Sequence, residues 1–392
     1  MPATFQVLVG DLRTGHITAV IPVTATSWQQ VLNAAGTISA TVDVGAAEVT
    51  GLDLYHTTAP GRAFLCIQYD RTLIAGGPIW THKYNRAAGT LTLSGAGMWS
   101  LFDHRLVLPV LAEPLALGAA QSATTTYLTS QNKSLGDIAA GLVNQALAHV
   151  GGNAPIVFPA AQGLTPGAAH TYYGYDLATV GQRITELTAV IGGPEIRFQP
   201  RYKSGDPTSV EWVMLVGTPT QPQLVQGGAD WIFDASVPKS MVSDIDVDVL
   251  ATTLATRAWE VGGGTGAGIM LSQADSTTLT SAGYPLLEVV DRTHNGVLVQ
   301  ADLDAYAAQL LAAQNRPSTA IKVKVRNDGA PADGASASGP RLSQYVAGDY
   351  CQLVIGADPY LLPGARRARI LQIDGDLGFE CTITLATIAA EV

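Results

Sequence analysis

The residues of this chain best suited to chemistry are three aspartates that alternate with apolar residues. Asp244, Asp246 and Asp248 occupy every second position, so a β-strand would place all three carboxylates on one face. Such a set could bind Ca²⁺, but an EF-hand loop needs glycine at its sixth position and glutamate at its twelfth, where this chain has Val249 and Ala255. We therefore favour an acidic strand face over a calcium site.

A glycine-rich segment, residues 261–268, superficially resembles a dinucleotide-binding loop and follows the strand-like residues 257–261. That fingerprint requires a helix directly afterwards, because the helix N-terminus holds the pyrophosphate. Residues 269–275 lack a helical pattern. We predict a flexible hairpin loop and no bound cofactor.

The remaining reactive side chains form no catalytic pattern. The seven histidines show no zinc-ligand spacing, and a Gly-x-Ser-x-Gly elbow is absent from the sequence. Asp103 and His104 are adjacent, and on a strand they would point to opposite faces, so we interpret them as the polar end of a strand domain. We predict no enzyme activity and no metal site. Three widely separated cysteines in apolar strand contexts are expected to be buried and free: Cys66, Cys351 and Cys381.

Composition favours a protein with large permanent interfaces. Only 14% of the 392 residues are charged and 47% are hydrophobic, whereas roughly one quarter charged is usual. An alanine-rich globular enzyme would also fit these percentages. The net charge of −10 argues against a nucleic-acid binder. The N-terminus lacks the pattern of a secretion signal, and the most apolar segment, residues 106–120, is too short to span a bilayer.

Periodicity predicts three regions along the chain. Residues 1–107 contain only short alternating strands, which favours a barrel or sandwich. Residues 108–220 combine the apolar arm with two helices, one capped by Ser134 and one from about 176 to 190, and with a hairpin. Residues 221–392 return to strands with one helix near 302–314. A weak echo links residues 62–69 with 348–355, each followed by a hairpin.

Six segments combine these alternating strands, hairpins and helix: residues 28–42, 71–105, 175–187, 193–201, 346–355 and 366–373. Together they resemble the minor tail proteins of long-tailed actinobacteriophages, which are similar to baseplate or tail-tip hub proteins. The resemblance implies a mainly β (α+β) fold. It would have two tube-type β-barrel domains, residues 1–107 and 221–392, with a small helical insertion at 108–220.

The resemblance also implies a structural function in the virion. Hub proteins of this kind form homotrimers that join the tail tube to the distal tip and surround the channel for tape measure and DNA. The implied partners are the distal tail protein, the tape-measure protein and a downstream tip or fibre protein. No cofactor, specific nucleic-acid binding or membrane span is implied.

Two sets of residues are candidates for this role. Leu108 and Leu111, in the apolar arm, are expected at a subunit interface, although the arm could equally be a linker packed on its own domain. Asp244, Asp246 and Asp248 are expected in an acidic channel lumen.

The alternative is a carbohydrate- or receptor-binding tail module, or a cell-wall hydrolase. Six tryptophans could supply stacking platforms for sugars, but their alternation with aliphatic residues favours core or interface positions.

Overall fold

The computed structural model describes residues 5–110, 127–190, 192–237, 239–330 and 339–387. The chain forms two compact units. Residues 1–245 with 323–392 make the large unit, and residues 246–322 make the small unit. The three-part division predicted from the sequence stays a prediction. Among the described residues no helix is long and apolar enough to cross a membrane.

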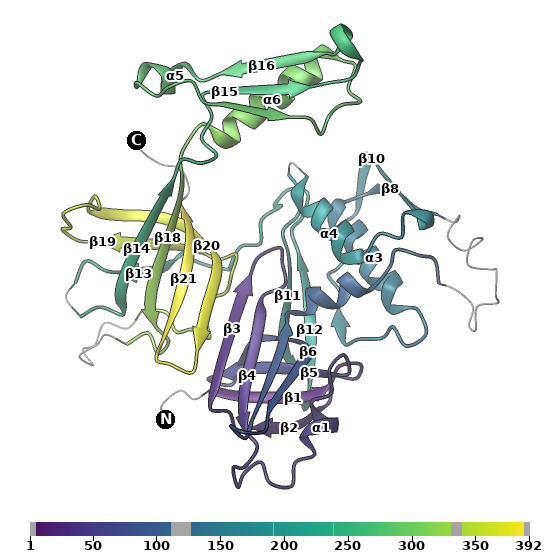
Figure 1. Ribbon diagram of the computed structural model, residues 1–392, viewed down its shortest axis with the longest axis vertical. Coiled ribbons are helices and arrows are strands. Elements are labelled where there is room, and N and C mark those ends of the chain that lie inside the picture. Colours follow the sequence, from purple (N-terminus) through teal and green to yellow (C-terminus); the bar gives the residue numbers. More distant parts are fainter. Residues whose placement is uncertain (1–4, 111–126, 191, 238, 331–338, 388–392) are drawn as a thin grey trace. The chain divides into compact units, whose positions relative to one another are not determined.

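The first strand group of the large unit has the order β2-β1-β5-β6-β7-β4-β3 (Figure 1). Its long strand β6 turns a corner, because its first half pairs with β5 and its second half with β7. The strands are β1 (Phe5–Asp11), β2 (Ile17–Ile21), β3 (Ala25–Val31), β4 (Thr37–Asp43), β5 (Ala63–Tyr69), β6 (Thr72–Asn85) and β7 (Thr90–Ala96); helix α1 (Leu54–Thr57) and the 3₁₀ helix η1 (Met98–His104) accompany them.

The second strand group repeats this arrangement. Its long strand β20 pairs with β19 through its first half and with β3 of the first group through residues 372–376, while β21 lines its other edge. The two groups therefore share one continuous 13-stranded sheet. The strands are β13 (Trp231–Asp234), β14 (Val242–Leu250), β18 (Ser318–Arg326), β19 (Tyr350–Ile355), β20 (Gly364–Asp376) and β21 (Glu380–Thr387).

The sequence echo coincides with a repeated set of three strands. β5 leads into the corner strand β6 and then β7, and β19 leads into the corner strand β20 and then β21. A register shift lies near the middle of both corner strands, between Ile79 and Thr81 and between Ile370 and Gln372. Such shifts bend a strand and increase its twist, which lets one strand serve two neighbours.

The insertion between the groups is helical and β-stranded, as predicted. Ser134 caps α3, because its Oγ accepts the N–H of Asp137 at 2.9 Å. The second helix begins at Val180 and not near 176, because Leu177 has a left-handed φ of 46° and Thr179 provides the cap. The elements are β8 (Tyr127–Lys133), α3 (Leu135–Leu147), β9 (Ile156–Val157), β10 (Leu164–Tyr173), η2 (Gly174–Asp176), α4 (Val180–Ala189), β11 (Ile196–Lys203) and β12 (Asp206–Val216).

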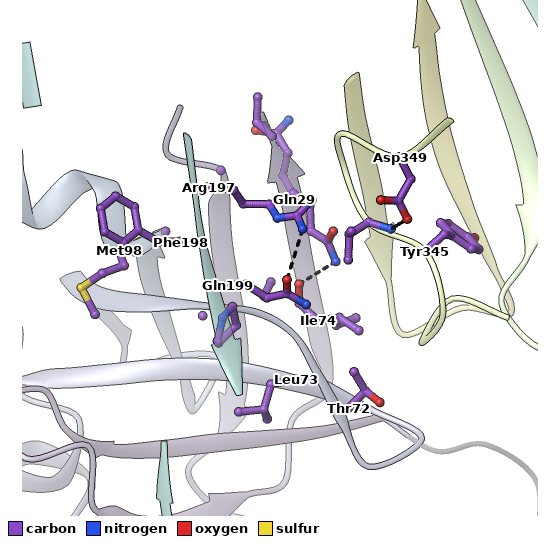
Figure 2. A pocket seen from close by; sticks show the side chains of 18 of the residues that line it. Gln29, Thr72, Leu73, Ile74, Met98, Arg197, Phe198, Gln199, Tyr345 and Asp349 are labelled. Atoms are coloured by element: carbon purple, nitrogen blue, oxygen red, sulfur yellow. Dashed lines mark hydrogen bonds between the residues drawn. The ribbon is translucent and has the colours of Figure 1, made fainter. Parts of the chain in front are cut away.

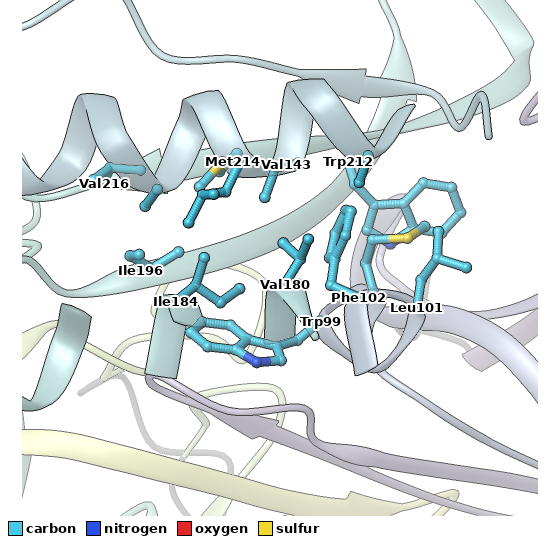
Figure 3. Packing of buried hydrophobic residues seen from close by; sticks show 14 of the residues in the cluster. Trp99, Leu101, Phe102, Val143, Val180, Ile184, Ile196, Trp212, Met214 and Val216 are labelled. Atoms are coloured by element: carbon cyan, nitrogen blue, oxygen red, sulfur yellow. The ribbon is translucent and has the colours of Figure 1, made fainter. Parts of the chain in front are cut away.

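One hydrophobic core joins this insertion to the first strand group. Figure 3 shows Trp212 and Met214 of β12 with Val143 of α3 and Ile184 of α4, all buried around η1. Trp212 also donates its indole N–H to the carbonyl of Gly76 at 3.0 Å. The insertion therefore shares its hydrophobic core with the first strand group.

Besides the end of β14 and the start of β18, the small unit contains a three-stranded sheet of order β16-β15-β17 with one covering helix. β15 pairs antiparallel with β16 and parallel with β17, and α6 packs on it through buried Leu303 and Ala307. Its elements are β15 (Arg257–Val261), η3 (Gly266–Gly268), β16 (Leu271–Asp275), α5 (Thr277–Ser281), β17 (Glu288–Asp291) and α6 (Gln300–Gln314). The predicted mainly β fold class is confirmed.

Candidate assembly surfaces and internal cavity

The three aspartates do lie along one strand, β14. Asp244, Asp246 and Asp248 are exposed, and Ile245 and Val247 between them are half-buried. β14 is the terminal strand in the sheet order, next to β18. The face is not purely acidic, since Lys322 Nζ of β18 lies 3.6 Å from Asp248 Oδ2.

The start of the apolar arm packs on the insertion. Leu108 is half-buried, and its carbonyl accepts hydrogen bonds from Gln145 Nε2 at 3.2 Å and His149 Nε2 at 3.4 Å. Leu106 and Val110 on either side are exposed. Leu111 lies outside the described residues.

The second strand group exposes large apolar side chains at its hairpin tips. Tyr360 and Leu362, between β19 and β20, are 79% and 75% exposed, and Phe379, between β20 and β21, is 81% exposed. The tips lie at opposite ends of β20. Isolated exposed side chains are common, but aromatic side chains at loop tips are also the usual anchors of protein interfaces.

A cavity of about 300 Å³ lies within the large unit, where the two strand groups meet (Figure 2). Its lining is rich in amides, and Gln30 Nε2 donates to the carbonyl of Ile74 at 2.6 Å. Arg197 of β11 donates from Nη2 to Gln199 at 3.2 Å and from Nη1 to the carbonyl of Ala347. The Gln30 contact ties β3 to β6, and the Arg197 contact ties β11 to the loop before β19.

A buried ion pair joins the insertion to β20 close to this cavity. Arg369 donates from Nη2 to Glu195 Oε2 and from Nη1 to the hydroxyl of Tyr350 at 2.9 Å. The same Glu195 oxygen accepts the N–H of Leu224 at 2.8 Å. Burial nevertheless raises the pKa of Glu195, against the effects of Leu224 and Arg369.

The cavity has few ionisable groups in its described lining. The ionisable side chains among the described residues that line the cavity are Arg197, Tyr345 and Asp349, and no nucleophile is paired with a base there. The three cysteines are buried and free, as expected. Burial raises the pKa of Cys351 and of Cys381 to about 12, so their thiols stay protonated and unreactive at neutral pH.

Other sequence candidates also have structural positions. The glycine-rich segment 261–268 joins β15 and β16, so the predicted hairpin loop is confirmed. Asp103 and His104 belong to η1 and not to a strand, so that interpretation was wrong. Trp28, Trp99 and Trp212 are buried; the half-buried tryptophans donate their indole N–H groups internally: Trp80, Trp231 and Trp259.

Sequence reasoning missed one cluster, in the small unit. Glu260, Asp291 and His294 bring ligand atoms within 4.8 Å of one another. Asp291 and His294 are three residues apart, but Glu260 is 34 residues from His294. The available signal was the Asp-x-x-His spacing, which is too common to select a site.

Solved structures with a similar fold come from tail proteins. No protein-family model and no curated protein sequence matches the chain. A tail protein from Neisseria meningitidis MC58 is similar over 98% of this chain and 96% of its own, with 13% identity and a TM-score of 0.56. The 43 kDa tail protein of prophage MuSo2 from Shewanella oneidensis is similar over 98% of both chains, with 10% identity and a TM-score of 0.57. At these identities the likeness concerns the fold, and the chain has a fold found in phage tail proteins.

Proposed function

We propose that this chain is a structural virion protein, the central hub of a phage tail tip. The observation that carries the proposal is the likeness of fold to two tail proteins over 98% of this chain. The low charged fraction and the absence of a nucleophile–base pair in the described cavity lining also support a structural role.

The proposed assembly is a homotrimer. The two strand groups repeat the same three-strand arrangement, so three copies would supply six related strand sets around one axis. The six strand sets could then match the six-fold symmetry of the tail tube, and the three subunits could match the three-fold symmetry of the tip. Closed symmetry also prevents the open-ended growth that a heterologous interface otherwise produces.

The proposed lumen carries Asp244, Asp246 and Asp248. DNA that passes through a hub must not adhere to its wall, and negative side chains prevent the counterion release that drives binding to basic surfaces. The ion pair of Asp248 with Lys322 weakens this effect at one of the three positions.

The proposed partners are the distal tail protein, the tape-measure protein and a downstream tip or fibre protein. The exposed tips at Tyr360 and Phe379 and the arm with Leu108 and Leu111 are the candidate contacts. Replacing both leucines with Ser would remove apolar burial worth about 1.5 to 3 kcal/mol per side chain. Unchanged tail assembly would mean that the arm is a linker.

The oligomeric state tests the proposal most directly. Light scattering of the purified full chain over a dilution series should give three times the chain mass. A protein that stays monomeric at every concentration, and that is also monomeric in isolated tails, would contradict it. For the lumen, changing the three aspartates to Lys should retain DNA at low salt, and the matched triple Asn variant should not.

A further inference from the structure

The cluster in the small unit has a buried carboxylate without a permanent cation. The Glu260 side chain is 1% exposed, and Oε1 lies 2.7 Å from His294 Nδ1. Oε2 is buried and has no hydrogen-bond partner. An unsatisfied charged oxygen is costly to bury, so a further positive group is expected at this oxygen.

A second carboxylate lies directly beside the first. Glu260 on β15 and Asp291 on β17 are register partners in the parallel pair. Asp291 Oδ1 accepts the N–H of Thr293 at 2.8 Å, and Oδ2 lies 4.0 Å from His294 Nδ1. Like charges at opposite positions on neighbouring strands destabilise a sheet, and a cation between them removes the repulsion.

The imidazole is held in place for a ligand role. The His294 ring stacks on the Tyr306 ring of α6 with a centroid distance of 3.8 Å and an interplanar angle of 8°. Its Nδ1 faces both carboxylates. A ring fixed by stacking loses little entropy when it coordinates an ion, in the same way that hydrogen-bonded partners orient metal ligands elsewhere.

The spacing suits a small divalent ion. Four-coordinate Zn²⁺ with bonds near 2.0 to 2.1 Å separates its ligand atoms by about 3.3 Å. The observed separations from His294 Nδ1 are 2.7 Å to Glu260 and 4.0 Å to Asp291. Shifts of less than about 1 Å therefore convert this arrangement into a coordination shell with an open fourth position.

We propose that Glu260, Asp291 and His294 bind one divalent transition-metal ion in the small unit, with Zn²⁺ as the reference ion. Two carboxylates and a neutral imidazole carry two negative charges, which the ion neutralises. The imidazole favours Zn²⁺ over Ca²⁺ and Mg²⁺, which prefer oxygen ligands. The ion would join β15 to the loop before α6 and so brace a unit with few core residues.

The test uses the purified full chain, treated with EDTA and then titrated with Zn²⁺, with Ca²⁺ in a parallel titration. We expect one Zn²⁺ per chain by elemental analysis and calorimetry, and no Ca²⁺ binding at the same concentrations. Glu260→Gln and His294→Gln should each weaken Zn²⁺ binding by at least about 100-fold, since losing an outer-shell partner alone costs about 10- to 100-fold.

The chain offers a matched control. Asp53 and His56 have the same sequence spacing as Asp291 and His294, and Asp53 Oδ2 lies 2.7 Å from His56 Nδ1, as Glu260 Oε1 does from His294 Nδ1. Both residues are exposed and belong to no metal-ligand group among the described residues. His56→Gln should bind Zn²⁺ like the parent.

Circular dichroism of each variant separates loss of a ligand from loss of folding. If Glu260→Gln fails to fold, the milder Asp291→Asn takes its place with the same expected loss. Absence of stoichiometric Zn²⁺ binding at micromolar free ion, or binding that survives both Glu260→Gln and His294→Gln, overturns the proposal. Neither result bears on the trimer.

Discussion

Glu195 in the large unit is a half-buried carboxylate and Glu260 in the small unit is a fully buried one, and their surroundings differ. The Glu195 side chain is 15% exposed and pairs with the guanidinium of Arg369, which is charged at every physiological pH. Glu260 is 1% exposed and has a histidine and a second carboxylate as neighbours. The first carboxylate has a guanidinium partner within the chain, whereas the ion proposed for the second would have to come from solution. We therefore expect the stability of the large unit to be independent of added metal ions, and the stability of the small unit to depend on the proposed ion.

The largest expected effect is the loss of the permanent pair. Arg369→Met should lower the free energy of unfolding by about 3 to 5 kcal/mol, because Glu195 would remain as an uncompensated buried charge. Urea denaturation followed by tryptophan fluorescence measures this change. The double variant with Glu195→Gln should recover much of the loss, and a double variant as unstable as the single one would show that Arg369 acts through packing alone.

The next effect is specific to the small unit. Removing the proposed ion with EDTA should destabilise that unit by about 2.7 kcal/mol relative to a solution at 100 times the dissociation constant. Hydrogen exchange of backbone amides in residues 257–314 should then accelerate. Residues 196–216 of the large unit serve as the internal reference, and equal acceleration in both regions would remove the distinction between them.

Lowering the pH should change the stability contributions of Glu195 and Asp291 in opposite directions. Burial raises the pKa of Glu195 above 4.5, so its contribution to stability is fully present below that pH and is lost as the pH rises through the folded-state pKa. For Asp291, burial opposes the shift, but Thr293 and His294 lower the pKa below 3.8. Its contribution is present above that pH and is lost as the pH falls.

Single variants isolate these contributions. The stability difference between the parent and Glu195→Gln should shift in favour of Gln as the pH rises from about 4 to about 7, because Gln never acquires the buried charge. For Asp291→Asn the difference should shift in favour of the parent as the pH rises from about 3 to about 5. Urea denaturation at each pH measures both, and parallel profiles would contradict the comparison.

The smallest effect is expected at the exposed Asp53 and His56. The hydrogen bond between the Asp53 carboxylate and His56 lowers the pKa of Asp53, and burial opposes this shift only weakly. Water screens exposed pairs strongly, so His56→Ala should leave the melting temperature unchanged within error in a thermal scan. A clear decrease in the melting temperature would mean that the spacing of the two residues contributes more to stability than their burial does.

Local signals were sufficient to predict many elements from the sequence. The apolar run at residues 63–69 predicted β5 without error, and the Ser134 cap marked the start of α3. The second helix was placed too early because nothing in the apolar spacing reveals the left-handed backbone at Leu177. Its true start depends on one dihedral angle and one threonine side chain.

Long-range partners could not be predicted. Glu195 and Arg369 are 174 residues apart, and Glu260 and His294 are 34 apart. The pairing of β20 with β3 requires a glycine at Gly375, where an added Cβ would lie 2.2 Å from the Trp28 ring. Such close approaches become visible only when both strands are in place.

The pairing of β3 with β20 has a consequence for how the chain is made. Gln29 of β3 bonds to Asp374 of β20, 345 residues later. At about 5 to 20 residues per second, a ribosome needs about 20 to 70 s to synthesise the chain between them. During that time one edge of β3 has no partner strand, and an open edge invites pairing with another nascent chain. The pairing of β3 therefore waits until β20 has been synthesised, and slower synthesis lengthens the interval in which neighbouring chains on one messenger can aggregate.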